Sequence, residues 1–185
     1  MTVPGPEQTI REYLTAGRAR VAAHPVSGAQ GWQAETWMGG FDAIPETVQF
    51  GKMRGDSRRQ VYLVSFETRA GRKMRFACLV RRDDAGAWRF AGCAGGGVDG
   101  SPQRGHAWVN LGGGWGPFYA GGAILEDGGE VARVRLRAAD GTTLEDTVED
   151  GLVLFITDDE MRRPVMAELI DRSGRVTSQH ETMGR

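Results

Sequence analysis

The sequence has no long apolar run. Its longest, Leu152–Ile156, is the length of a strand and far short of the roughly 20 residues that a membrane helix needs. The first residues, MTVPGPEQTIREYL, have no basic start followed by an apolar stretch, so they do not form a signal peptide. We therefore expect a bacterial, cytoplasmic protein that does not bind a membrane. A chain whose leader has been removed would look the same, which leaves export open.

An excess of either charge is also missing. The 23 basic and 24 acidic residues nearly cancel, leaving a formal charge of -1, so we expect no strong attraction to nucleic acid. Two basic rows alternate along predicted strands, namely Arg133, Arg135, Arg137 and Lys73, Arg75, Arg81. We interpret both rows as exposed strand faces and do not expect nucleic acid as a partner.

Cysteine is scarce, and no metal-ligand spacing is present. Cys78 and Cys93 form no CxxC pair and lie in strand-like stretches, which predicts two buried free thiols. A disulfide between neighbouring strands of an exported protein is the open alternative. The histidines, His24, His106 and His180, share no ligand spacing, and we expect His180 in a frayed tail. We predict no metal, no cofactor and no catalytic residue.

Acidic residues gather between Glu145 and Glu160. Their spacing is not that of an EF-hand, and alternation along a strand would divide neighbouring carboxylates between two faces. We interpret them as a solvated surface that balances the arginine row, with an adventitious calcium site as the alternative. If Asp140-Gly141 forms a two-residue turn, Arg135 faces Asp146 across the hairpin.

A glycine motif at Gly95–Gly100 matches G-x-G-x-x-G after a predicted strand. A dinucleotide site needs a helix to follow, so that its N-terminus approaches the pyrophosphate. Here Pro102 and a segment without helical periodicity follow instead. We interpret the match as a chance one.

The first half predicts one helix and an antiparallel meander. Apolar residues recur at helical spacing over Pro6–Ala23, and Pro25 ends the helix. The period then changes to two over four predicted strands, Val48–Met53, Gln60–Thr68, Arg72–Arg82 and Ala87–Gly92. This element order is similar to cystatin-like and NTF2-like folds. The resemblance covers about half of the chain, rests on no motif and implies no function.

The second half predicts five short strands and no helix. They are Val131–Ala139, Thr142–Val148, Gly151–Thr157, Pro164–Asp171 and Arg175–Glu181. Such a series is typical of a small sandwich or barrel. We therefore expect an α+β, mostly antiparallel protein in three parts: a helix plus sheet over 1–93, a glycine and aromatic connector over 94–122, and an all-β domain over 123–185 docked on the first.

The connector carries the best candidate binding residues. Large rings spaced by glycines form either a recognition surface or a plug between the two halves. The candidates are His106, Trp108, Trp115, Phe118 and Tyr119. Alternation in HAWVNLGG points Trp108 outward, whereas we expect the other half of the chain to cover Trp115.

These features favour a non-enzymatic binding or protein-interaction module. The alternative is a small-ligand-binding protein or small enzyme with a pocket between the first helix and a curved sheet, to which Trp32, Trp37 and Tyr62 would contribute. The partner is then an unknown protein, a small ligand or a second copy of the chain. An exposed apolar patch would favour the module, and converging polar groups in a closed cavity would favour the enzyme.

Overall fold

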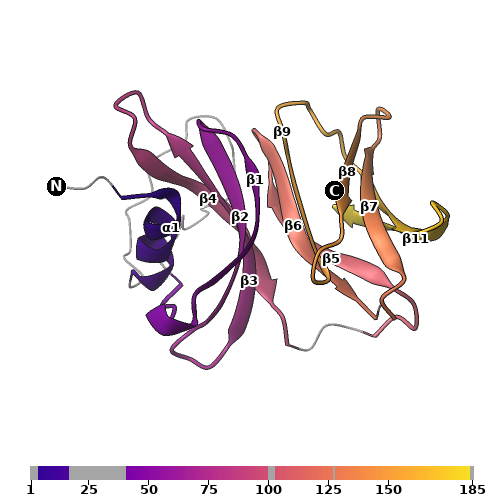
Figure 1. The fold of residues 1–185 in the computed structure, drawn as a ribbon, viewed down its shortest axis with the longest axis horizontal. Helices are drawn as coiled ribbons and strands as arrows, with labels where there is room; N and C mark the ends of the chain where they lie inside the picture. The colour runs from indigo at the N-terminus through magenta and orange to yellow at the C-terminus, as the bar shows by residue number, and fades with distance from the viewer. Residues whose placement is uncertain (1–3, 17–40, 100–102, 127, 184–185) are drawn as a thin grey trace, which may run out of the picture.

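The computed structural model describes residues 4–16, 41–99, 103–126 and 128–183, and this part of the chain is mostly antiparallel β with one short N-terminal helix (Figure 1). The helical elements are α1 (Pro6–Thr15) and the 3-10 turn η1 (Pro45–Thr47). The strands are β1 (Gln49–Gly55), β2 (Arg59–Glu67), β3 (Lys73–Arg82), β4 (Trp88–Gly97), β5 (Trp108–Gly114), β6 (Phe118–Leu125), β7 (Val131–Ala138), β8 (Thr143–Thr147), β9 (Leu152–Thr157), β10 (Val165–Asp171) and β11 (Val176–Met183).

The first sheet is an antiparallel meander with the strand order β1-β2-β3-β4. Helix α1 packs on one of its faces, where Ile10 and Leu14 are fully buried. Pro6 lies in the first turn, where its missing N–H is not needed, and Glu7 complements the positive end of the helix. The predicted helix and four strands are therefore present, but the helix is shorter than predicted, because Ala16 already leaves the helical conformation with φ -59° and ψ 136°. Residues 17–23 of the predicted helix lie outside the described part.

The middle sheet is formed by β5, β6 and β9. Its central strand β6 has no solvent-exposed face: Phe118 and Ala120 join the core beside the third sheet, whereas Tyr119 joins Val61, Leu63 and neighbouring residues of the first sheet. Figure 1 accordingly shows β6 and β9 between the first sheet and the strands β7 and β8. A strand that is buried on both faces has apolar residues in succession rather than in alternation. The sequence of β6, FYAGGAIL, consists of apolar and small residues and fits this rule.

Glycine permits this close stacking. A Cβ atom on Gly121 would lie 3.2 Å from Leu63 Cδ1 of the first sheet, and one on Gly112 would lie 2.5 Å from the Cα of Gly95 on β4. Gly112 and Gly121 are thus points where the first and middle sheets touch. The predicted division of the chain at 94–122 stays a prediction, to which the structure adds that β5 and β6 of this segment pair with each other and with β9.

The third sheet has the order β11-β10-β7-β8. Val134 and Leu136 of β7 are fully buried in the core shared with the middle sheet. The arginines of the same strand alternate with them and form ion pairs with Glu145 and Glu168. The arginine row is therefore neutralised by carboxylates on the neighbouring strands.

The β7–β8 hairpin differs from the predicted register by one residue. Arg135 lies opposite Glu145, and Asp146 lies opposite Val134. The reason is a three-residue loop, with Ala138 N donating to Thr142 O and Gly141 at a φ of 89°, in place of a two-residue turn. A shift of one residue moves every side chain to the other face, so Asp146 is buried where exposure was expected.

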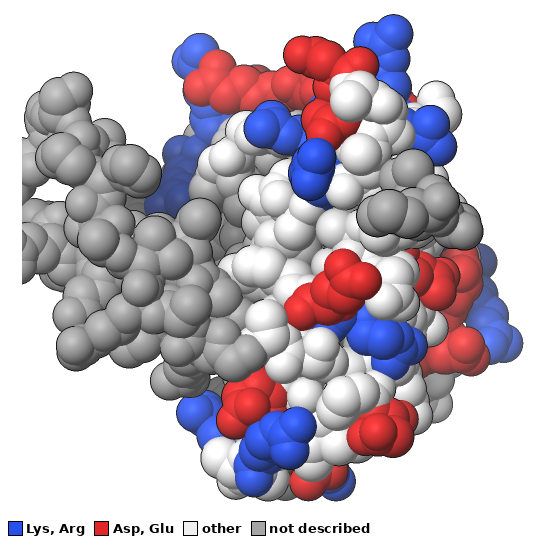
Figure 2. Space-filling model, turned by 90° about the vertical axis from the view of Figure 1, so that its left-hand side faces the viewer, with Lys and Arg blue, Asp and Glu red and all other residues white. Residues whose placement is uncertain are grey.

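Charges of both signs are interspersed on the face of the molecule that Figure 2 shows, around a band of uncharged residues. Among the described residues, no helix is long and apolar enough to cross a membrane.

Candidate functional site

The five candidate residues of the connector occupy three different places. Trp115 and Phe118 flank the turn of the β5–β6 hairpin, whereas Trp108 pairs with Leu125 at its open end. Tyr119 points into the first sheet, where burial raises the pKa of its hydroxyl. The structure therefore brings together Trp115 and Phe118 but separates them from Trp108.

The burial of the two tryptophans is the reverse of the prediction, which placed Trp108 outward and Trp115 under the other half of the chain. Trp108 is only 4% exposed, whereas Trp115 is 38% exposed. The alternation argument for Trp108 failed because loop side chains and a third-sheet residue fold over the ring: the guanidinium of Arg104 lies 4.0 Å from its centroid, and His180 contacts its edge. Trp108 Nε1 also donates to Glu126 Oε1 at 3.2 Å.

His180 belongs to this covered corner rather than to a frayed end. Its Nε2 lies 3.2 Å from the carbonyl oxygen of Val109, while its buried Nδ1 has no partner among the described residues. Burial lowers the pKa of His180. Backbone N–H groups of Arg104 and Gly105 donate to Glu126 and hold the pKa of that carboxyl below its ordinary value. His106 itself is exposed.

The aromatic cleft is the open feature near Trp115. It has a volume of about 680 Å³ between the β5–β6 turn and the β9–β10 loop. Its lining residues are Trp115, Gly116, Pro117, Phe118, Asp158, Asp159, Glu160, Met161, Arg162 and Arg163.

One wall of the cleft is an aromatic pair beneath a guanidinium. The Trp115 and Phe118 rings lie 5.1 Å apart at 66°, and Arg163 Cζ lies 4.4 Å from the Trp115 ring centroid. Both walls are anchored from below, because Phe118 and Met161 are each 2% exposed and belong to the core between the middle and third sheets. The exposed indole of Trp115 is thus held against side chains that are fixed in the core.

The carboxylates of the cleft already have partners. Asp158 forms an ion pair with Arg59, Glu160 with Arg162, and Asp159 accepts a hydrogen bond from Thr157. The Arg59 contact lowers the pKa of Asp158. None of the lining residues is a serine, cysteine or histidine, so the cleft offers neither the usual nucleophiles nor a histidine base. This arrangement is suited to binding.

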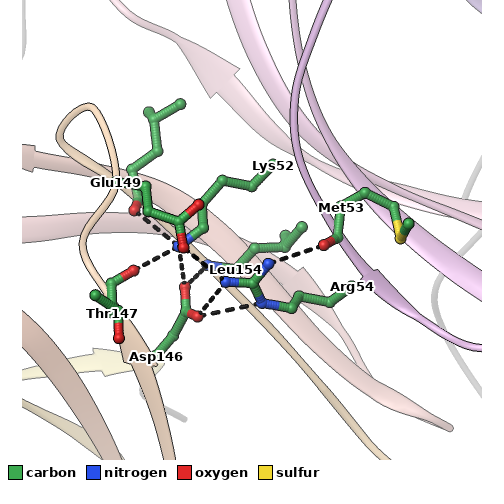
Figure 3. A network of polar contacts seen from close by, with 8 residues as sticks. Lys52, Met53, Arg54, Asp146, Thr147, Glu149 and Leu154 are labelled. Carbon is green, nitrogen blue, oxygen red and sulfur yellow. Dashed lines mark hydrogen bonds and ion pairs between the residues drawn. The ribbon is translucent and has the colours of Figure 1, made fainter.

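A second polar arrangement joins all three sheets (Figure 3). Lys52 Nζ of β1 lies 2.7 Å from Asp146 Oδ2 of β8, and both residues are 7% exposed. Asp146 Oδ1 accepts from Arg54 Nη2 at 2.8 Å, and Oδ2 accepts from the backbone N–H of Leu154 on β9 at 2.8 Å. Lys52 also donates to the carbonyl of Thr147.

Glu149 completes the network at its exposed side. Its carboxylate lies 3.2 Å from Arg54 Nη2 and 3.4 Å from Lys52 Nζ. The hydrogen bond from Arg54 lowers the pKa of Glu149, and the bond to Asp146 raises the pKa of Arg54. Every charge here has an opposite partner, so we interpret the network as a structural connection between sheets.

The other predicted pocket residues are only partly described. Trp32 and Trp37 lie outside the described residues. Tyr62 is 6% exposed beneath α1, and its hydroxyl donates to Gln60 Oε1 at 2.9 Å. A pocket between the helix and its sheet therefore stays a prediction.

Sequence reasoning missed the β9–β10 loop and the buried pair. The acidic segment TDDE was interpreted as solvated surface, and the apolar residue directly after it, Met161, is the one that anchors the loop. No sequence signal distinguishes Lys52 from an exposed lysine, because its partner lies on a strand far along the chain. Gly95–Gly97 end β4, and the described residues after them hold no helix that could approach a phosphate.

Among the described residues, no group of three or more histidine, cysteine, aspartate or glutamate side chains could hold a metal ion. Compared with protein-family models, curated proteins and solved structures, the chain matches none of them.

Proposed function

We propose that this chain is a non-enzymatic binding protein that holds a segment of a partner protein in the aromatic cleft. The observation that carries the proposal is the exposed indole of Trp115, fixed over a buried support and flanked by Arg163. Tryptophan and arginine are the residue types most enriched among binding hot spots.

The composition of the cleft favours a protein partner over a small molecule. Small-molecule pockets are mostly apolar with few polar groups, whereas five of the ten lining residues here are charged. An apolar centre with a polar rim is the usual anatomy of a protein interface. The three acidic and two basic residues of the lining nearly balance, so we expect a partner segment with an apolar anchor rather than one of strong net charge.

The architecture is part of the same proposal. The middle and third sheets, with a shared core, support a small sandwich, and the helix with its four-stranded sheet is similar in element order to cystatin-like and NTF2-like folds. Neither similarity assigns an activity. The sandwich supplies a rigid base for two adjacent loops, and binding residues are commonly placed on such loops.

The test is affinity capture from the cells that make the protein, with wild type and Trp115→Ala compared by quantitative mass spectrometry. A captured partner is then purified, and its Kd is measured by calorimetry. We expect Trp115→Ala and Arg163→Ala each to weaken binding by at least about tenfold, since hot-spot truncation costs about 2 kcal/mol or more.

Trp88 and Arg82 provide the matched control. They form another cation–π pair, with Arg82 Cζ 4.9 Å from the Trp88 ring at the start of β4, and neither residue lines the cleft. Trp88→Ala and Arg82→Ala should leave the Kd unchanged. A partner bound equally well by wild type and Trp115→Ala would refute the proposed site, and sedimentation of the purified protein would show whether the partner is a second copy of the chain.

A further inference from the structure

A second cavity lies between the first and middle sheets, and we call it the interlayer cavity. Its volume is about 160 Å³, and its lining residues are Arg75, Gly95, Gly96, Gly97, Val98, Asn110, Leu111, Gly112, Gly121, Gly122, Ala123 and Leu125. It shares no lining residue with the aromatic cleft. Whatever binds here is therefore independent of the function proposed for Trp115.

Arg75 is the charged residue of this cavity. It pairs with Gly96 across β3 and β4 and alternates with Phe76, so it shares the face of Ala77, which packs toward the middle sheet. Its Nε donates to Ser65 Oγ at 3.4 Å, and among the described residues no carboxylate forms an ion pair with it. The half-buried guanidinium thus keeps most of its five N–H donors unused.

Such an arginine is costly to keep without a counter-charge. Burial lowers the pKa of Arg75, which means that its surroundings disfavour the charged form. Arg54, in contrast, lies beside two carboxylates that raise its pKa. A guanidinium never loses its proton under ordinary conditions, so its unused donors need water or an anion, and only an anion also neutralises the charge of Arg75.

The opposite wall supplies a second donor. Val109 and Leu111 of β5 pack toward the third sheet, so alternation directs Asn110 toward the first sheet and the cavity. Its side-chain amide can donate two hydrogen bonds. β4 and β5 are also edge strands of their sheets, and an edge strand presents unpaired backbone N–H groups.

Space for a ligand is created at Gly96. A Cβ atom there would meet no other atom within 4 Å, and the backbone has no positive φ, so the position faces open space. The cavity is smaller than the 300–1,000 Å³ typical of drug-sized ligands. Only a compact ligand of a few atoms fits.

We propose that the interlayer cavity binds a small oxyanion, either inorganic phosphate or a short carboxylate, through the guanidinium of Arg75 and the amide of Asn110. A planar guanidinium matches the two oxygens of a carboxylate or phosphate with paired hydrogen bonds. The ligand would thereby supply the negative charge that this part of the protein lacks.

The experiment is a titration of ¹⁵N-labelled protein with sodium phosphate and, separately, with sodium acetate, with sodium chloride at the same ionic strength as reference. We expect saturable shifts in the amide signals of the glycines that line the cavity with at least one of the two oxyanions. The comparison also decides between phosphate and carboxylate as the ligand class.

Two variants test the assignment, each with a matched control. Arg75→Gln should weaken binding at least tenfold, whereas Arg81→Gln, on an exposed arginine of the same strand, should not. Gly96→Val should fill the cavity and abolish binding. Gly128→Val, at a glycine outside the cavity where a Cβ atom would also meet nothing within 4 Å, should preserve it.

The proposal fails if neither oxyanion gives saturable shifts beyond those of chloride, which would make the cavity a water-filled gap. It also fails if Arg75→Gln binds as well as wild type, which would indicate an adventitious surface ion. Amide spectra of each variant show whether it is folded, and a variant that does not fold is replaced by Arg75→Lys, for which we expect intermediate affinity.

Discussion

Lys52 Nζ of β1 lies 2.7 Å from Asp146 Oδ2 of β8, so the first and third sheets meet in a buried ion pair. Both carry backbone hydrogen bonds as well, Lys52 to Thr147 O and Asp146 from Leu154 N. Both residues are only 7% exposed, so neither charge is well hydrated if the other is removed. The pair therefore couples the position of one sheet to that of the other.

Replacing Asp146 by alanine should lower the free energy of unfolding by about 3–5 kcal/mol, because it leaves the buried ammonium of Lys52 with only its longer contact to Glu149. Urea denaturation measures this change. Glu149→Ala is the control, since the Glu149 side chain is 55% exposed and solvent screens its ion pairs, so the free energy of unfolding should change little. A loss of only about 1 kcal/mol in Asp146→Ala would show that Glu149 or water compensates the lysine.

The two connector tryptophans should differ in their effect on stability. Trp108→Ala removes a ring that is 4% exposed and should cost about 3–5 kcal/mol. Trp115→Ala removes one that is 38% exposed and should cost about 1 kcal/mol or less. Denaturation midpoints of both variants check this order, and equal losses would contradict the burial that separates them.

The two thiols should be free and unequally reactive. Cys78 and Cys93 lie directly opposite each other on β3 and β4 as free cysteines, and Cys78 is fully buried. The hydrogen bond with Cys93, together with burial, raises the pKa of the Cys78 thiol, which disfavours the reactive thiolate. Alkylation of the folded protein without reductant should therefore modify Cys78 last, and unfolding should release both thiols. An intact mass two units lower, resistant to alkylation, would instead reveal a disulfide.

His180 should make the stability of the folded protein fall as the pH drops below about 6.5. Its pKa in the folded protein is lowered by burial, whereas the unfolded chain has an ordinary value near 6.5. The unfolded state therefore binds the proton more readily, so the stabilising effect is complete above about pH 6.5 and is lost as the pH falls toward the folded pKa.

Protonation of His180 would also place a second N–H at Nδ1, which has no partner among the described residues. The positive charges of Arg104 and His106 nearby disfavour that protonation further. Melting temperatures at pH 5, 6, 7 and 8 should fall toward pH 5 more steeply in wild type than in His180→Gln. Parallel curves would show that the histidine does not titrate in this way.

Much of the fold could be predicted from the spacing of apolar residues along the sequence. All nine strands predicted outside the connector are present, since hydrophobic alternation and Gly-containing turns are local signals. Strands β5 and β6 were harder to predict, because glycine has a low strand propensity and gives no alternating pattern. Gly112 and Gly121 of these strands are explained by contact between sheets, which is not a local property.

The candidate site could be predicted only in part, because some of its contacts join residues that are distant in the sequence. Trp115 and Phe118 could be selected as large rings near a glycine turn, but Arg163 reaches Trp115 from another loop. Asp146 was placed on the wrong face by a single extra residue in the β7–β8 turn. Errors of one residue in a turn change which charges meet, and they cannot be detected from composition.

The double burial of β6 has a consequence for how the chain is made. The face of the first sheet that carries Val61, Leu63 and Leu79 is covered by Tyr119 and by Leu154 of β9. Leu154 leaves the ribosome long after that face has formed, so the growing chain exposes an apolar surface to chaperones and to other nascent chains. A message that ends before β9 should therefore produce an aggregating fragment rather than a shorter working protein.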